Sequence, residues 1–168
     1  MPVLAKVDVT IATPDQVELP GILDEVFKYW CKLKHDRWAP RWDEFELEHI
    51  SNDAIPYTII VDVIPDPLDF RYRFWGTANT ANIGYDCTGK SVRENEMFSD
   101  KVFNECKQIY EERRPLVYFT KAIKPSGLHR EYMRIRLPMT KDNVTVSHIL
   151  SVMHISENLS KLYESDSD

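Results

Sequence analysis

The stretch from Phe70 to Gly89 constrains the fold of this chain more than any other. Aromatic and basic residues alternate along residues 70–75, which is typical of a β-strand that presents different side chains to its two faces. Gly76 ends this strand, and small and polar residues lead from there to two further glycines, Gly84 and Gly89. The order predicts a strand that passes into short helical turns, which curl over a sheet and form one wall of a cavity.

The composition fits one globular domain with terminal extensions. Of the 168 residues, 43% are hydrophobic and 11% are aromatic, which suffices for a packed core. The formal net charge of −6 disfavours nucleic acid and an anionic membrane as partners. We find no apolar run of about 20 residues, no signal peptide and no Cys-x-x-Cys pair. A reducing cytoplasm is therefore the expected location, and no metal is expected.

The chain divides into an extension with an amphipathic helix (residues 1–35), a domain (36–156) and an acidic tail (157–168). Hydrophobic residues at three- and four-residue steps predict that the helix begins between residues 14 and 21 and ends near His35. Its wide apolar stripe must be covered, either by the sheet of the same chain or by a second copy. In the second case, the dimer or output face would consist of Leu23, Phe27 and Trp30.

Five segments predict the strands of one antiparallel sheet. Residues 57–64 and 69–75 form a hairpin, and residues 115–122, 130–137 and 144–155 form a meander. Small helices and a longer helix over residues 98–113 connect the two groups. The predicted fold is α+β, with a five-stranded antiparallel sheet, short helices and one longer helix on one face, and the N-terminal helix able to cover the other.

Three motifs carry a resemblance to a known family. They are the strand end at residues 70–77, the Gly-Tyr-Asp-Cys-Thr-Gly run at residues 84–89, and a Trp/Pro/Arg segment from Arg37 to Trp42. Together they resemble the PAS domain, and most of all a stand-alone PAS family common in alphaproteobacteria. The likeness covers residues 25–155. It implies a five-stranded antiparallel sheet with a cleft between sheet and helices, and a role in sensing and signalling rather than catalysis.

Seven residues are candidates for lining such a cleft, because small-molecule sites combine large aromatic walls with a few polar groups. They are Arg73, Trp75, Thr77, Tyr85, Tyr118, Met133 and His148. The planar guanidinium of Arg73 would suit a ligand carboxylate or phosphate. The alternative is a structural ion pair between Arg73 and Asp86, which lies in the turn that the resemblance folds back toward the strand.

The common PAS cofactors are disfavoured. The resemblance implies that a haem-binding His would come from the region of the main helix, and residues 98–113 contain none. Flavin photoreceptors of this class carry their Cys in an Asn-Cys-Arg-Phe-Leu-Gln run, which the surroundings of Cys87 do not match. His148 and His154 lie about 20 Å apart on an extended strand, so they cannot share one metal.

These features favour a sensory or regulatory module without enzymatic activity. It would bind an unknown small molecule in the cleft and signal through a separate protein, with homodimer formation as a further expectation. One alternative is a ligand-free interaction scaffold whose own aromatic side chains fill the cleft. The other is a small α+β enzyme of the isomerase kind, for which Asp62 and His148 are the in-strand candidates.

Overall fold

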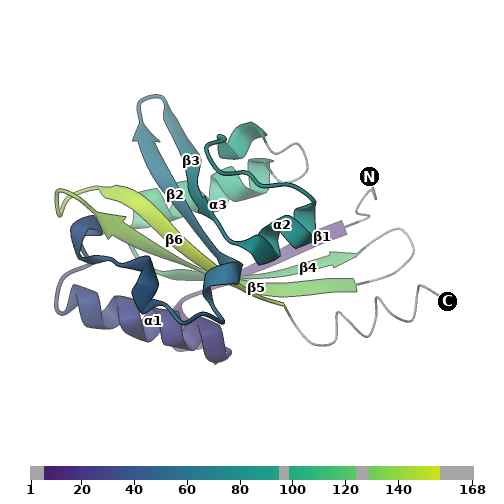
Figure 1. Ribbon diagram of the computed structural model, residues 1–168, viewed down its shortest axis with the longest axis horizontal. Coiled ribbons are helices and arrows are strands. Elements are labelled where there is room, and N and C mark those ends of the chain that lie inside the picture. The colour runs from purple at the N-terminus through teal and green to yellow at the C-terminus, as the bar shows by residue number, and fades with distance from the viewer. Residues whose placement is uncertain (1–5, 95–98, 124–128, 156–168) are drawn as a thin grey trace.

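The computed structural model describes residues 6–94, 99–123 and 129–155. Its strands form one antiparallel sheet in the order β1-β4-β5-β6-β2-β3 (Figure 1). These strands are β1 (Lys6–Ala12), β2 (Thr58–Pro65), β3 (Leu68–Trp75), β4 (Leu116–Ile123), β5 (His129–Thr140) and β6 (Val146–Ile155). The helices are α1 (Gly21–Lys34), α2 (Thr77–Ile83) and α3 (Ser99–Glu112). Short 3-10 turns are η1 (Pro14–Gln16), η2 (Trp42–Glu44), η3 (Leu47–His49), η4 (Ile55–Tyr57) and η5 (Val92–Glu94).

The sheet has six strands, and this corrects the expected five. The additional strand is β1, which pairs antiparallel with β4 along its whole length. Val7, Val9 and Ile11 alternate as a strand requires, but they are 40–48% exposed and give a weak hydrophobic signal. Pairing with β4 orders this segment, and β4 is more than 100 residues away in the sequence. A local pattern cannot reveal such a partner.

The sheet separates two hydrophobic cores. On one face, which we call the α3 face, α3 packs over side chains from β2, β3, β4 and β6. On the opposite face, the α1 face, α1 packs over β5 and β6 together with the segment between α1 and β2. In Figure 1 the helix α1 lies below the sheet, whereas α2 and α3 lie on the other side of it. The sheet is thus covered on both faces, as the order of the elements predicts.

The apolar stripe of α1 is covered by the protein's own sheet. Leu23 and Trp30 are 0% and 2% exposed, and the indole Nε1 of Trp30 donates a hydrogen bond to the carbonyl oxygen of Pro138 at 2.8 Å. These two residues therefore do not form an exposed dimer face, and that assignment is corrected. Phe27 is half-buried and stacks on Trp30, with 6.1 Å between the ring centroids.

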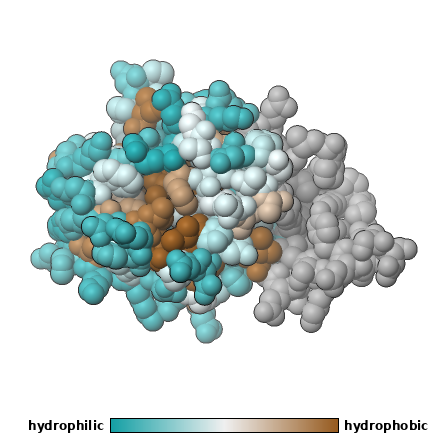
Figure 2. All heavy atoms as spheres, viewed as in Figure 1, coloured by the Kyte–Doolittle hydropathy of each residue, from teal (hydrophilic) through white to brown (hydrophobic). Residues whose placement is uncertain are grey.

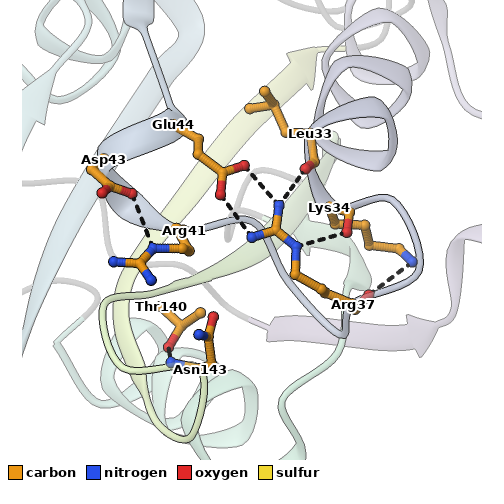
Figure 3. A network of polar contacts seen from close by, with 8 residues as sticks. All are labelled: Leu33, Lys34, Arg37, Arg41, Asp43, Glu44, Thr140 and Asn143. Carbon is orange, nitrogen blue, oxygen red and sulfur yellow. Dashed lines mark hydrogen bonds and ion pairs between the residues drawn. The ribbon is translucent and has the colours of Figure 1, made fainter.

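Arg37 fixes the segment that follows α1 (Figure 3). Its guanidinium donates two hydrogen bonds of 2.7 Å to the carboxylate of Glu44. It also donates to the carbonyl oxygens of Leu33 and Lys34 at 2.7 and 3.1 Å, which lack partners in the last turn of the helix. One side chain thus joins the end of α1 to η2, the turn that carries Trp42.

A β-bulge changes the alternation of side chains near the end of β3. Ile60 lies opposite Phe74, but the next residue, Val61, lies opposite Tyr72, so Arg73 is the additional residue. Phe74 therefore packs in the α1-face core and Trp75 in the α3-face core. Strict alternation would place Phe74 beside Tyr72, and this expectation is wrong beyond Tyr72. The bulge is what brings Trp75 into the interior on the α3 face.

Two further expectations concern the ends of the chain and membranes. The acidic tail at residues 157–168 lies outside the described residues. Within the described ranges, the longest helices have 14 residues, and none has the length and apolar character needed to cross a bilayer.

Candidate functional site

The structure divides the seven candidate residues between the two faces of the sheet. Trp75 and Tyr118 are buried on the α3 face, whereas Met133 packs on the α1 face together with Arg73 and His148. Three candidates are exposed: Thr77 at the start of α2, Tyr85 just beyond its end, and Arg73, whose side chain is 49% exposed. The seven residues therefore do not line one cleft. The prediction is corrected by the bulge and by the presence of a core on each face.

Arg73 forms an ion pair with Asp62 instead of Asp86. Its Nε donates to the Oδ1 atom of Asp62 at 2.6 Å. Asp86 accepts hydrogen bonds from the backbone N–H and the hydroxyl of Thr88, at 2.8 and 2.6 Å. The turn does fold back on β3, since Gly89 donates its N–H to the Tyr72 carbonyl at 2.7 Å. It does so on the edge of β3, whereas the guanidinium of Arg73 is directed to the α1 face.

Asp62 also binds His148 on the α1 face. The Nε2 atom of His148 lies 3.2 Å from Asp62 Oδ1, and its Nδ1 atom lies 2.8 Å from the hydroxyl of Ser147. An ionised carboxylate can only accept, so the proton of a neutral imidazole lies on Nε2 and Ser147 donates to Nδ1. Trp42 covers the ring, with 3.7 Å between the centroids and 7° between the planes. Burial is the main cause that lowers the pKa of His148 to about 4, although Asp62 raises it.

Acid is expected to destabilise the protein through His148. Its native pKa of about 4 lies below the ordinary value of 6.5, so between these values the unfolded chain binds a proton that the native protein does not. The free energy of unfolding therefore falls as the pH drops from about 6.5 to 4, by on the order of 3 kcal/mol, and does not depend on this group above that window. Urea unfolding at pH 4 to 7.5 measures the effect.

His148→Gln should remove this part of the pH dependence. His49→Gln is the matched control, because His49 is 58% exposed and pairs with Glu46 at the surface. An equal fall in stability for wild type and His148→Gln would contradict the assignment. The charged groups acting on His148 are Asp62, Arg73 and Lys141.

A second cluster of polar side chains is buried on the α3 face, with Arg136 at its centre. This residue is 1% exposed and extends from β5 toward α3. Its Nε donates to Glu105 Oε1 at 3.1 Å, and its Nη1 donates to the hydroxyl of Ser151 at 2.9 Å. Lys101, one turn before Glu105 on α3, donates to the other carboxylate oxygen. A buried ion pair thus joins α3 to the middle of the sheet.

The charges in this cluster determine its protonation. Burial is the largest single influence on the pKa of Glu105 and raises it. The positive charges of Arg136 and Lys101 together outweigh burial, so the pKa of Glu105 lies below its ordinary value. Burial is the main cause that lowers the pKa of Arg134, and the positive charge of Arg136 adds to it. Glu105 is therefore ionised. For Arg134, burial and the nearby positive charge of Arg136 both destabilise the charged form of the guanidinium.

Four buried polar atoms on this face have no hydrogen-bond partner within the described part of the chain. They are Trp75 Nε1, Thr120 Oγ1, Arg134 Nε and Arg136 Nη2. Tyr118, Thr120, Arg134 and Arg136 share a face because β4 and β5 pair Tyr118 with Arg134 and Leu116 with Arg136. Trp75 belongs to the core on that same face. Unpaired buried donors are rare and costly, so their concentration on one face identifies a candidate binding site.

Sequence reasoning missed most of this cluster. Arg134 and Arg136 alternate with apolar residues, which is also the pattern of a strand with one exposed face. Glu105 gave a better signal, because it lies within the helical stripe formed by Val102, Cys106 and Ile109. A carboxylate inside a core stripe requires a buried cation. Among the described residues, the cluster included, no group of three or more His, Cys, Asp or Glu side chains could hold a metal.

No protein-family model matches the chain, and no curated protein matches it. One solved structure that matches is described as that of an RNA-binding light-oxygen-voltage receptor, with 11% identity and a TM-score of 0.46. The match covers 99% of this chain and 43% of that one, so this chain spans less than half of the receptor chain. Likeness at this level carries no argument about fold or function. The fold rests on the antiparallel sheet and its helices, which are consistent with a PAS-like arrangement.

Proposed function

We propose that this protein is a sensory or regulatory PAS-like module without enzymatic activity, which binds a small molecule on the α3 face of its sheet. The observation that carries the proposal is the group of four unpartnered polar atoms on that face. Each such atom costs about 1–3 kcal/mol when it is buried without a partner. A bound molecule that supplied the missing partners would offset this cost.

The signal is proposed to pass to a separate protein. A ligand can shift a conformational equilibrium only if it binds one state better than the other. Because Glu105 and Arg136 link α3 to the sheet, a ligand that reached Arg136 would act on both. Figure 2 shows a mainly hydrophilic face with hydrophobic residues exposed near its centre, and exposed apolar areas favour protein contacts. Homodimer formation and a cytoplasmic location belong to the same proposal.

Two alternatives have different supporting features. A ligand-free scaffold would satisfy the four atoms with ordered water, which commonly bridges buried polar groups. An enzyme would use the His148–Asp62 couple, but Trp42 stacks over the imidazole on the α1 face. RNA is left out of the proposal because the chain carries a net charge of −6.

Native mass spectrometry of the protein purified from cells tests the proposal. We expect an adduct of small mass that is lost under denaturing conditions and is reduced in Thr120→Val. The matched control is Thr58→Val, since Thr58 is equally buried but its hydroxyl donates to the Ala54 carbonyl at 2.9 Å. A native mass equal to that of the polypeptide in every preparation would overturn the proposal and favour the scaffold.

A further inference from the structure

We infer that the ligand of the α3 face carries an oxyanion, either a carboxylate or a phosphate group, which Arg134 and Arg136 bind. This inference rests on the proposed function and names its ligand class. Three features of the buried cluster lead to it: the hydrogen-bonding character of the unpartnered atoms, the balance of charge, and the position of the two arginines on one face of β5.

The unpartnered atoms require acceptors. An indole N–H and the N–H groups of a guanidinium can only donate, and a threonine hydroxyl can donate as well as accept. Trp75, Arg134 and Arg136 therefore need acceptor atoms from the ligand, and Thr120 is compatible with one. A molecule that presents mainly donors would leave the same atoms unpaired.

The charge balance requires a negative group. Among the described residues of the cluster, the cations Lys101, Arg134 and Arg136 face a single carboxylate, that of Glu105. Both oxygens of Glu105 are already used, one by Arg136 and the other by Lys101. Arg134 donates through Nη2 to the sulfur of Met153 at 3.2 Å, which is a weak acceptor. Arg134 as a whole is half-buried, but its Nε atom is buried without a partner, and an anionic ligand would compensate its charge.

The position of the guanidinium groups suits an oxyanion. Arg134 and Arg136 are two residues apart on one face of β5, so their Cα atoms lie about 6.6 Å apart. Aromatic rings hold both groups in place, with Arg134 Cζ at 5.6 Å from the Tyr132 ring and Arg136 Cζ at 5.8 Å from the Tyr118 ring. Each guanidinium has one buried donor without a partner, Nε of Arg134 and Nη2 of Arg136, and each would give one charge-assisted hydrogen bond to an oxyanion.

Isothermal titration calorimetry tests the inference. The full chain is freed of bound molecules by unfolding in urea and refolding, and then titrated with inorganic phosphate, succinate and benzoate at equal ionic strength. Succinamide and benzamide serve as neutral counterparts of the two acids. We expect at least one anion to bind and neither amide to do so. The phosphate and carboxylate arms distinguish the two sources of the oxyanion.

Arg134→Met is the decisive variant, because it leaves the ion pair of Arg136 with Glu105 in place. Affinity for the binding anion should fall roughly tenfold to a hundredfold, the value of one or two charge-assisted hydrogen bonds. Arg73→Met is the matched control, since it removes a guanidinium from the opposite face, and it should leave the affinity unchanged. Thr120→Val gives a second variant in case Arg134→Met does not fold.

Each outcome decides the inference. Amides that bind as well as the acids, or an equal loss in Arg134→Met and Arg73→Met, would overturn it. If native mass spectrometry finds a bound molecule that has no acid group, and no anion binds in the titrations, the inference fails and the proposed function stands. If no adduct and no binding are found, both fail. An adduct whose mass identifies an acid supports the inference even where the three probes do not bind.

Discussion

Arg136→Met is expected to lower the free energy of unfolding by about 3–5 kcal/mol, which is typical of breaking one side of a buried ion pair. The side chain of Glu105 is 7% exposed and would keep its hydrogen bond with Lys101 but lose that with Arg136. The hydroxyl of Ser151 would lose the hydrogen bond of 2.9 Å that it accepts from Arg136 Nη1. Urea unfolding followed by circular dichroism measures the change.

Two further variants test the reason for this loss. Arg73→Met removes an ion pair in which Arg73 is 49% exposed, so it should cost less than about 1 kcal/mol. In the double variant Glu105→Gln with Arg136→Met, the uncompensated carboxylate is gone, and we expect part of the stability to return. A loss in Arg136→Met no larger than in Arg73→Met would show that the ion pair does not stabilise the fold.

Gly76→Ala is expected to cost about 3 kcal/mol, at the upper end of the range for overpacking a core. A Cβ atom at this position would lie 2.3 Å from the carbonyl oxygen of Pro56 and 2.6 Å from that of Ile55. Both are backbone atoms of η4, so they cannot move as a side chain would. The φ angle of −63° suits alanine, which makes the cost steric rather than torsional.

Gly21→Ala is the control for this prediction, because a Cβ at Gly21 meets nothing within 4 Å. It lies in the first turn of α1, where alanine is a better helix former than glycine. The stability of Gly21→Ala should equal or exceed that of wild type. Equal stability of the two alanine variants would contradict the close approach between Gly76 and η4.

Periodic patterns in the sequence predicted most of the fold. The stripe that predicts a helix beginning between residues 14 and 21 and ending near His35 corresponds to α1, and the stripe over residues 98–113 corresponds to α3. The hairpin and meander correspond to β2 through β6.

The two wrong predictions about the sheet, the number of strands and the face on which Trp75 lies, depend on a contact distant in sequence and on a local irregularity. β1 is ordered by β4, and the bulge at Arg73 moves Trp75 to the other face. The alternation of Val7, Val9 and Ile11 is only a weak signal for β1, and the bulge has no periodic signal in the chain itself.

The candidate site was predictable only in part. Trp75 and Tyr118 were expected as aromatic walls, and both lie in the core of the α3 face. Arg73 and His148 were expected in the same cleft, but Asp62 joins them on the α1 face. Arg134 and Arg136 of β5 were not predicted as site residues, because alternation alone does not show whether a strand face is exposed to solvent or covered by a helix. Pairing across the sheet and the packing of α3 decide that.

The indole N–H signals of the four tryptophans provide the most direct test that the α3 face holds a ligand. Nitrogen–proton correlation spectra would be compared for protein as purified, after refolding from urea, and after adding the anion that binds best. Trp75 Nε1 has no partner, whereas Trp30 and Trp38 already donate to carbonyl oxygens at 2.8 and 2.9 Å. If a ligand occupies the α3 face, the Trp75 signal moves while those of Trp30 and Trp38 stay in place. A Trp75 signal that is identical in all three samples would contradict ligand binding on this face.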